Sequence, residues 1–229
     1  MWDRRELKMR AKGAFMKNYG SSVLVALLMG MLVNFMGSYN ISTLEGFLSS
    51  NQSDEILGLF SMILVVAGLI VGIVTVFVAN ILEVGGCKFF IKNQTEQPGV
   101  GMILDIFRSG NYLNVAVTMF FRDLYIFLWS LLFLVPGIIK SYEYRMIPYI
   151  LAENPGMDRK EAFMISRKMM DGQKMDFFIL ELSFYGWIIL SFLTCNLLNV
   201  FFIAPYMQAS FAEAYYYTKV KAYQEGYIR

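Results

Sequence analysis

Five charged side chains lie within long apolar stretches of the sequence, where an ionised group has little water to solvate it. Arg122 and Asp123 are adjacent, Glu143 and Arg145 are two residues apart, and Glu181 stands alone. Charged residues inside a membrane segment face the protein interior and pair with one another. We therefore expect a buried polar network, with Glu143 paired to Arg122 and Asp123 paired to Arg145.

The same five charges allow two interpretations. They could line a polar pathway or a binding site for an ion, a proton or an anionic substrate, or they could form an ionic lock that fixes helix packing. Carboxylates can act as general acids or bases. However, the sequence has no histidine, no metal-spaced set of cysteines and no phosphate-cradling glycine loop. We predict a protein that is not an enzyme and has no catalytic residues, metal or cofactor.

The elements that must position these charges are membrane helices. Of the 229 residues, 57% are hydrophobic and 17% are charged, against about 25% charged in soluble domains. The stretch 56–82 has no charge at all, and a spanning helix needs only ~20 residues. We predict an all-α polytopic transmembrane bundle in a single domain, 1–229. The six expected helices are 20–38, 56–82, 112–135, 138–152, 176–193 and 198–217.

Basic residues near helix ends indicate which ends face the cytoplasm. With the N-terminus inside, the cytoplasmic segments are 1–19, 83–111, 153–175 and the tail after residue 213, and they hold 17 of the 20 lysines and arginines. The 39–55 loop carries acids and no basic residue, as an outer loop should. Both termini are therefore expected in the cytoplasm.

The segment 140–175 decides the number of crossings. As a single outer loop it would hold seven basic residues on the wrong side of the membrane. The conflict disappears if the chain turns at Pro136-Gly137 and returns through 138–152. This arm is short, so it either crosses fully or is re-entrant, shielded by its neighbours. Lys140 would then anchor it among the outer headgroups.

Two prolines and one glycine motif carry further expectations. Pro148 and Pro205 each remove a backbone hydrogen bond and should kink the fourth and sixth helices. Gly68 and Gly72 form a GxxxG motif, which lets helices approach closely. That approach would serve packing within the chain or the formation of a homo-oligomer.

Two basic segments are predicted to lie as helices on the inner membrane surface. The stretch 158–171 places Ala162, Ile165 and Met169 on one face and begins with Asp158 as an N-cap. The N-terminal stretch 1–19 has a similar pattern. Their charges could bind lipid headgroups or a partner protein, or could only set the topology. The candidate headgroup contacts are Arg159, Lys160, Arg167, Lys168 and Lys174.

The stretch from Leu128 to Trp187 resembles the bacterial integral membrane family known as domain of unknown function 975. The resemblance rests on the PGIIK run at 136–140, the YILAENP turn at 149–155, the segment 166–174 and the LSFYGW helix start at 182–187. The basic N-terminus also resembles the family's opening. Tyr185 and the Cys195-Asn196 turn depart from the family pattern. The resemblance implies a multi-pass protein of the bacterial cytoplasmic membrane and no established activity.

Three functions remain open at this point. The first is a non-enzymatic membrane module that binds a protein partner or lipid. The second is a small transporter or channel that uses the buried charges, and the third is a membrane enzyme, for which no catalytic constellation is visible. We favour the first function, with the bilayer as its main partner and no nucleic acid involved.

Overall fold

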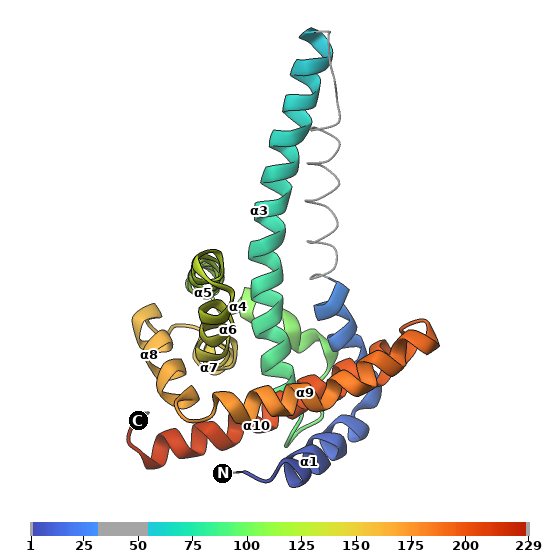
Figure 1. Ribbon diagram of the computed structural model, residues 1–229, viewed down its shortest axis with the longest axis vertical. Helices are drawn as coiled ribbons and strands as arrows, with labels where there is room; N and C mark the ends of the chain where they lie inside the picture. The colour runs from blue at the N-terminus through green and yellow to red at the C-terminus, as the bar shows by residue number, and fades with distance from the viewer. Residues whose placement is uncertain (1, 32–54, 228–229) are drawn as a thin grey trace.

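The computed structural model describes residues 2–31 and 55–227, and within 55–73 it describes the side chains only in part. The described residues form helices joined by short turns and contain no strand (Figure 1). The all-α prediction is confirmed. The expected outer loop at 39–55 and the end of the first expected span lie outside the described residues, except for Glu55. The side chains of the Gly68–Gly72 motif also lie outside them.

The helices follow one another with few intervening residues. In chain order they are α1 (Arg4–Lys17), the helix Tyr19–Met31, α3 (Glu55–Lys92), the 3-10 helix η1 (Val100–Leu104), α4 (Asp105–Arg108), α5 (Tyr112–Leu132), α6 (Leu134–Glu143), α7 (Ile147–Glu153), α8 (Arg159–Met170), α9 (Lys174–Ser191), the 3-10 helix η2 (Phe192–Thr194), the π-helix η3 (Asn199–Ile203) and α10 (Ala204–Gln224).

Within the described residues, three helical segments are long and apolar enough to cross a membrane: Val74–Lys92, Tyr112–Leu132 and Lys174–Thr194. These segments overlap three of the six expected spans and are typical of a membrane protein. The expected span 138–152 is instead divided between α6 and α7, which have 10 and 7 residues. The expected span 198–217 is divided between η3 and α10.

The reversal between α5 and α6 occurs three residues before the predicted Pro136-Gly137 turn. Phe133 has an extended backbone (φ −154°, ψ 140°) and ends α5. Pro136 lies in the first turn of α6, where its missing N–H costs no intrahelical hydrogen bond. Gly137 packs directly on Ser130 of the opposite arm, and a Cβ at position 137 would overlap the serine side chain. The predicted hairpin is therefore present, with its closest approach at Gly137.

The two prolines behave differently: Pro148 begins a new helix after a turn, whereas Pro205 lies within a continuous helical stretch, 197–224, whose geometry changes just before the proline. The turn at 144–146 separates α6 from α7, and Pro148 is in the first turn of α7. Pro205 is in the first turn of α10, directly after the π-helix η3. Cys195 and Asn196, with φ of 49° and 64°, make the reversal between α9 and α10. Left-handed backbone is tolerated by Asn at single positions, which fits a turn without glycine.

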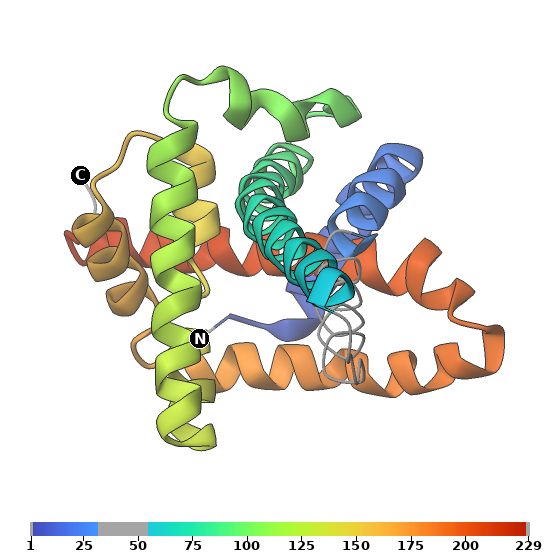
Figure 2. The same ribbon diagram turned by 90° about the horizontal axis from the view of Figure 1, so that it is seen from above.

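The apolar helices do not run parallel to one another. In Figure 1, α3 stands upright and α9 lies across it, while α5 points towards the viewer. Figure 2 shows α5 crossing the direction of α9. The N-terminal end of α3, the α5–α6 turn and the α9–α10 turn therefore point away from the body in three directions. The structure differs here from the parallel bundle expected from sequence.

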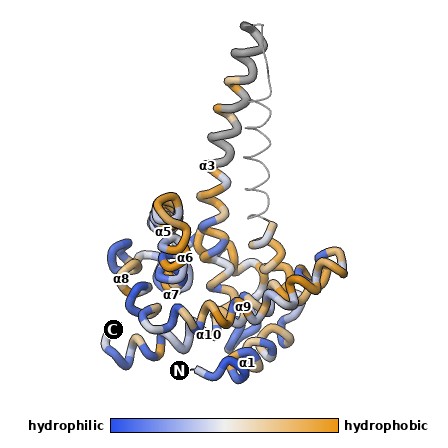
Figure 3. The backbone as a smooth tube through the Cα atoms, viewed as in Figure 1, coloured by the Kyte–Doolittle hydropathy of each residue, from blue (hydrophilic) through white to orange (hydrophobic). Residues whose placement is uncertain are grey.

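Polar elements lie on the sides opposite these three ends. In Figure 1, α1 lies below the body, and α8 and the C-terminus lie to the left. The segment after α3 lies at the top of Figure 2, opposite the α5–α6 turn at the bottom. Figure 3 shows the same division, with hydrophilic colours on α1, α8 and the end of α10 and hydrophobic colours on α5, α6 and the α9–α10 turn. The molecule thus has a polar side and an apolar side.

Both predicted surface helices bury their apolar faces in the protein. On α1, Leu7, Ala11 and Phe15 are fully buried, spaced four residues apart as one helical face requires, and α1 runs along α10. On α8, the predicted face of Ala162, Ile165 and Met169 is buried too. The apolar faces expected to enter the membrane surface are therefore occupied by protein, and their exposed faces are the basic ones.

A lysine on α1 ties that helix to α9. Lys8 Nζ donates a 2.6 Å hydrogen bond to Ser183 Oγ and lies 4.1 Å from the centre of the Phe184 ring. Burial, helped by the nearby Arg4 guanidinium, lowers the pKa of Lys8. This ammonium group is therefore a structural contact between α1 and α9, unlike the solvent-facing cations on the same helix.

Candidate functional site: a charged cavity between the helices

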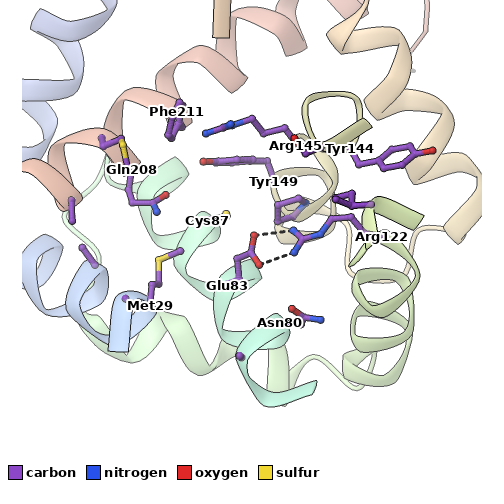
Figure 4. Close-up of a pocket in the computed structure, with 18 of the residues that line it drawn as sticks. Met29, Asn80, Glu83, Cys87, Arg122, Tyr144, Arg145, Tyr149, Gln208 and Phe211 are labelled. Atoms are coloured by element: carbon purple, nitrogen blue, oxygen red, sulfur yellow. Dashed lines mark hydrogen bonds and ion pairs between the residues drawn. The ribbon is translucent and has the colours of Figure 1, made fainter. Parts of the chain in front are cut away.

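A cavity of about 700 Å³ lies where α3, α5, the α6–α7 turn, α10 and the helix Tyr19–Met31 meet (Figure 4). Its wall mixes apolar side chains with charged and amide groups. The polar groups that matter below are Asn80, Glu83, Arg122, Arg145, Tyr149 and Gln208. Because two guanidinium groups and a carboxylate share one wall, this cavity is the principal candidate site.

The first charge cluster joins α5 to α3. Arg122 Nη1 and Nη2 donate to Glu83 Oε1 and Oε2 at 2.8 and 3.0 Å. Arg122 Nε donates to Asp123 Oδ1 at 2.9 Å, and Asn80 Nδ2 donates to Asp123 Oδ2 at 2.9 Å. The two terminal nitrogens of the guanidinium each face one oxygen of the Glu83 carboxylate. This bidentate arrangement is the strong form of an Arg–carboxylate pair. This cluster has one more negative than positive charge.

The second cluster joins the α6–α7 turn to α9. Arg145 Nη1 donates to Glu181 Oε2 at 2.8 Å, and the Tyr142 hydroxyl donates to the same oxygen at 2.7 Å. The guanidinium also lies 4.1 Å from the centre of the Phe211 ring of α10. Stacking on a ring leaves the edge N–H groups of a guanidinium free to bind other acceptors. Figure 4 shows Arg145 extending towards Phe211 along the cavity wall.

The third cluster lies apart from the cavity. Glu143 accepts 2.6 Å hydrogen bonds from Lys140 Nζ and from Lys174 Nζ, and its backbone carbonyl accepts one from Ser166 Oγ at 2.7 Å. Glu143 therefore joins α6 to α9 through its carboxylate and to α8 through its backbone carbonyl. This cluster has one excess positive charge, so the three clusters together are neutral.

The structure corrects the predicted pairing. Glu143 does not pair with Arg122, and Asp123 does not pair with Arg145. The turn at 144–146 changes the direction in which successive side chains point, so Glu143 faces the lysines while Arg145 faces Glu181. The five predicted residues are therefore divided among three clusters instead of forming one network.

Sequence reasoning missed the main partner of Arg122. The predicted second helix ended at residue 82, which placed Glu83 in a cytoplasmic segment, but α3 continues to Lys92. Asn80 and Glu83 are three residues apart, so both lie on one face of the helix. This spacing of two polar residues at the end of an apolar stretch could have indicated that the helix continues and that both side chains face the protein interior.

Lys140, which the sequence suggested as an outer-face anchor, is paired with Glu143. Besides its bond to Glu143, it lines a second pocket, of about 430 Å³, together with Arg159, Lys160 and Arg167 of α8. Of the other predicted headgroup contacts, Lys174 is engaged by Glu143, and Lys168 Nζ lies 4.7 Å from the centre of the Tyr227 ring. Three of the five predicted headgroup contacts therefore share a pocket.

A third, apolar cavity of about 1010 Å³ adjoins the charged one. The two cavities have four lining residues in common: Ala26, Gly30, Asn199 and Ala204. Leu28, Leu82 and Leu104 are among the other lining residues of the apolar cavity. The boundary between the charged and the apolar cavity is therefore lined by small and polar residues, and we call these four residues the neck.

No group of three or more metal-binding side chains occurs among the residues that the structure describes. Residues 132–224 match the model of a family described as Protein of unknown function (DUF975). The match confirms the resemblance noted from the sequence over this part of the chain, which runs from the end of α5 to the end of α10. Searches of curated proteins and of solved structures found no match.

Proposed function

We propose that this protein is a non-enzymatic module of the bacterial cytoplasmic membrane that holds a lipid-like amphiphile between its helices. One observation carries the proposal: the charged cavity and the apolar cavity share a neck at Ala26, Gly30, Asn199 and Ala204. An anionic headgroup next to Arg145 and an acyl chain in the apolar cavity would fit the two compartments. Small-molecule sites commonly combine an apolar wall with a few placed polar groups.

The division into a polar and an apolar side supports a membrane orientation. In the proposed orientation, the end of α3, the α5–α6 turn and the α9–α10 turn enter the bilayer from one side, each at a slant. Both termini, α1 and α8 remain on the cytoplasmic side, in agreement with the distribution of basic residues. The short α6 and α7 favour a re-entrant α5–α6 hairpin over a full crossing.

The partners of three acids support a non-enzymatic role. Asp123, Glu143 and Glu181 each accept a hydrogen bond from a cation. Each carboxylate is thus occupied by a neighbouring side chain, whereas a general acid or base must exchange a proton with its substrate.

The test uses the neck between the cavities. Ala204→Phe places a ring in the neck, and Ala67→Phe makes the same change at an exposed position on α3. Both variants and the wild type are purified in mild detergent, and retained lipid is quantified by mass spectrometry. We expect bound phospholipid in the wild type and in Ala67→Phe, and a smaller amount in Ala204→Phe. Equal lipid retention in all three proteins would refute the proposed cavity site.

A small transporter or channel is the second candidate, favoured by the two guanidinium groups in the wall of the cavity. Its test is solute flux in proteoliposomes with Arg122→Ala and Arg145→Ala, using Glu143→Ala as a control because Glu143 lies outside the cavity wall. Transport predicts flux in the wild type that falls only in the two cavity variants. The absence of flux, or equal behaviour of all variants at matched stability, would exclude it for the solutes tested.

A further inference from the structure

A second site is built where the α5–α6 hairpin meets α8. The pocket there has a volume of about 430 Å³, and four cations line it: Lys140 from α6 and Arg159, Lys160 and Arg167 from α8. No acidic residue is among its lining side chains. We propose that this pocket binds a phosphate-bearing headgroup of an anionic phospholipid. This inference does not depend on the occupancy of the central cavity.

The cations of this pocket are largely uncompensated within the described part of the chain. Lys140 is paired with Glu143, but no ion pair within the described ranges involves Arg159, Lys160 or Arg167. By contrast, every arginine and lysine of the central clusters has a carboxylate partner. A concave surface with unpaired cations is what an anion needs, because each added positive charge strengthens its attraction.

The two arginines are oriented by aromatic rings instead of by acids. The Arg159 guanidinium lies 4.1 Å from the centre of the Phe121 ring, and that of Arg167 lies 5.6 Å from the centre of the Tyr144 ring. A guanidinium held against a ring is positioned while its N–H donors remain available. Planar forks of this kind bind phosphate oxygens through two hydrogen bonds.

The position of these residues along α8 points the same way. Arg159 and Lys160 are the first two residues of the helix, after the N-cap Asp158, whose side chain accepts from Lys160 N. Cations at a helix N-terminus are opposed by the helix dipole, whereas an anion there is stabilised. Two cations at this end weaken the isolated helix, and Asp158 and Glu161 at the same end offset part of that cost. A bound phosphate would offset more of it.

The surroundings favour a lipid as the source of the phosphate. Trp129 forms part of the pocket wall and is 40% exposed, and tryptophan concentrates at the boundary between headgroups and acyl chains. Just beyond it, Leu131, Phe133 and Leu134 at the hairpin turn are about two-thirds exposed or more. A headgroup in the pocket would thus leave its acyl chains along an apolar turn. Basic pockets between membrane helices bind anionic headgroups in this way.

The test compares two triple variants that lose the same charge. Arg159→Gln/Lys160→Gln/Arg167→Gln removes the unpaired cations of the pocket, and Lys12→Gln/Lys17→Gln/Lys168→Gln removes three that do not line it. Full-length protein in neutral detergent is titrated with short-chain phosphatidylglycerol. We expect binding about tenfold or more weaker in the pocket variant and unchanged in the control. Equal weakening in both variants would overturn the site, because only net charge would then matter.

Two additional arms complete the test. If inorganic phosphate displaces the lipid from the wild type, the phosphate group alone is recognised; if it does not, the lipid as a whole is the ligand, and both results support the site. If the pocket variant melts earlier than the control, Lys160→Gln alone replaces it, since its exposed side chain has no packing role. Full lipid binding by Lys160→Gln would then overturn the proposal. The Ala204→Phe variant should bind normally here, which separates this site from the central cavity.

Discussion

The guanidinium of Arg122 donates two hydrogen bonds to the carboxylate of Glu83, at 2.8 and 3.0 Å, and thereby links α5 to α3. The Arg122 side chain is only 13% exposed. Removing one partner of a buried pair leaves an uncompensated charge, which costs far more than the pair contributes when both partners are replaced. The ion pair therefore links α3 to α5 and also forms part of the cavity wall.

Arg122→Leu should lower the free energy of unfolding by about 1–3 kcal/mol, because it leaves the partly exposed Glu83 and Asp123 without their cation. Glu83→Leu should cost less, because Arg122 keeps Asp123 as a partner. The measurement is a double-mutant cycle on denaturant unfolding in detergent, with Glu83→Leu/Arg122→Leu as the double variant. We expect a coupling of about 1–3 kcal/mol. If the two single substitutions lowered the free energy of unfolding additively, the pair would not stabilise the contact between α3 and α5.

Adjacent glycines on α3 should respond differently to the same substitution. A Cβ at Gly85 would overlap the backbone carbonyl of Ile103, whereas a Cβ at Gly86 would meet only the end of the Met29 side chain. Backbone cannot move aside cheaply, but a methionine thioether can change rotamer. Gly85→Ala should therefore destabilise by about 1–3 kcal/mol.

Gly86→Ala serves as the matched control for Gly85→Ala. Its cost should be small, because the gain in helix propensity, about 1 kcal/mol, offsets the shift of Met29. Thermal unfolding in the same detergent measures both variants. A larger loss in Gly86→Ala than in Gly85→Ala would contradict the close approach of α3 to η1.

Local features of this fold were predictable from sequence, because they depend on neighbouring residues. The α8 helix was predicted as 158–171 and spans Arg159–Met170, with Asp158 as its N-cap. The reversal that begins the returning arm was found from the charge distribution, and its error of three residues reflects a turn made by Phe133 in place of Pro136-Gly137. Periodicity, capping and charge asymmetry act over a few residues, so one sequence suffices to read them.

The partners of the buried charges were not predictable, because they depend on how distant helices cross. Glu83 and Arg122 are 39 residues apart, as are Tyr142 and Glu181. The expected pairs, Glu143 with Arg122 and Asp123 with Arg145, require membrane helices that run side by side, but α3, α5 and α9 run in different directions (Figure 2). Depth along a helix then no longer tells which residues meet. The cavities, formed by the same crossings, were missed for the same reason.

The two cysteines offer a test of the proposed membrane orientation. Cys195 is exposed at the α9–α10 turn, and Cys87 is buried in α3. The segment Lys174–Thr194 is long enough to cross the bilayer, so in the proposed orientation we place its turn at the outer side. An impermeant maleimide added outside intact cells without their wall should then label Cys195. Cys195→Ser should abolish that labelling.

A cysteine on the opposite side provides the control for orientation. Lys221→Cys, in the Cys195→Ser background, places an exposed thiol near the end of α10, on the proposed cytoplasmic side. The maleimide should reach it only after the membrane is opened. Labelling of Lys221→Cys from outside, together with protection of Cys195, would reverse the orientation.

The balance between Arg145 and Glu181 should set the charge preference of the central cavity. Glu181→Gln keeps the size of the side chain but removes the charge that neutralises Arg145. An anionic amphiphile should therefore bind several-fold more tightly, up to about tenfold for 1.4 kcal/mol of added attraction. Binding of a neutral amphiphile should not change. Competition between phosphatidylglycerol and phosphatidylcholine of equal chain length measures the preference directly.

The double variant Arg145→Gln/Glu181→Gln separates charge from packing in this experiment. It keeps both side chains polar and removes both charges, so the preference for the anionic amphiphile should fall below that of the wild type, although Arg122 still lines the cavity. Tyr142 can still donate its hydroxyl to the amide at 181, which preserves the contact between α6 and α9. If Glu181→Gln left the preference unchanged or lowered it, Arg145 would not be the group that meets the headgroup, and the placement of the amphiphile would have to be reversed.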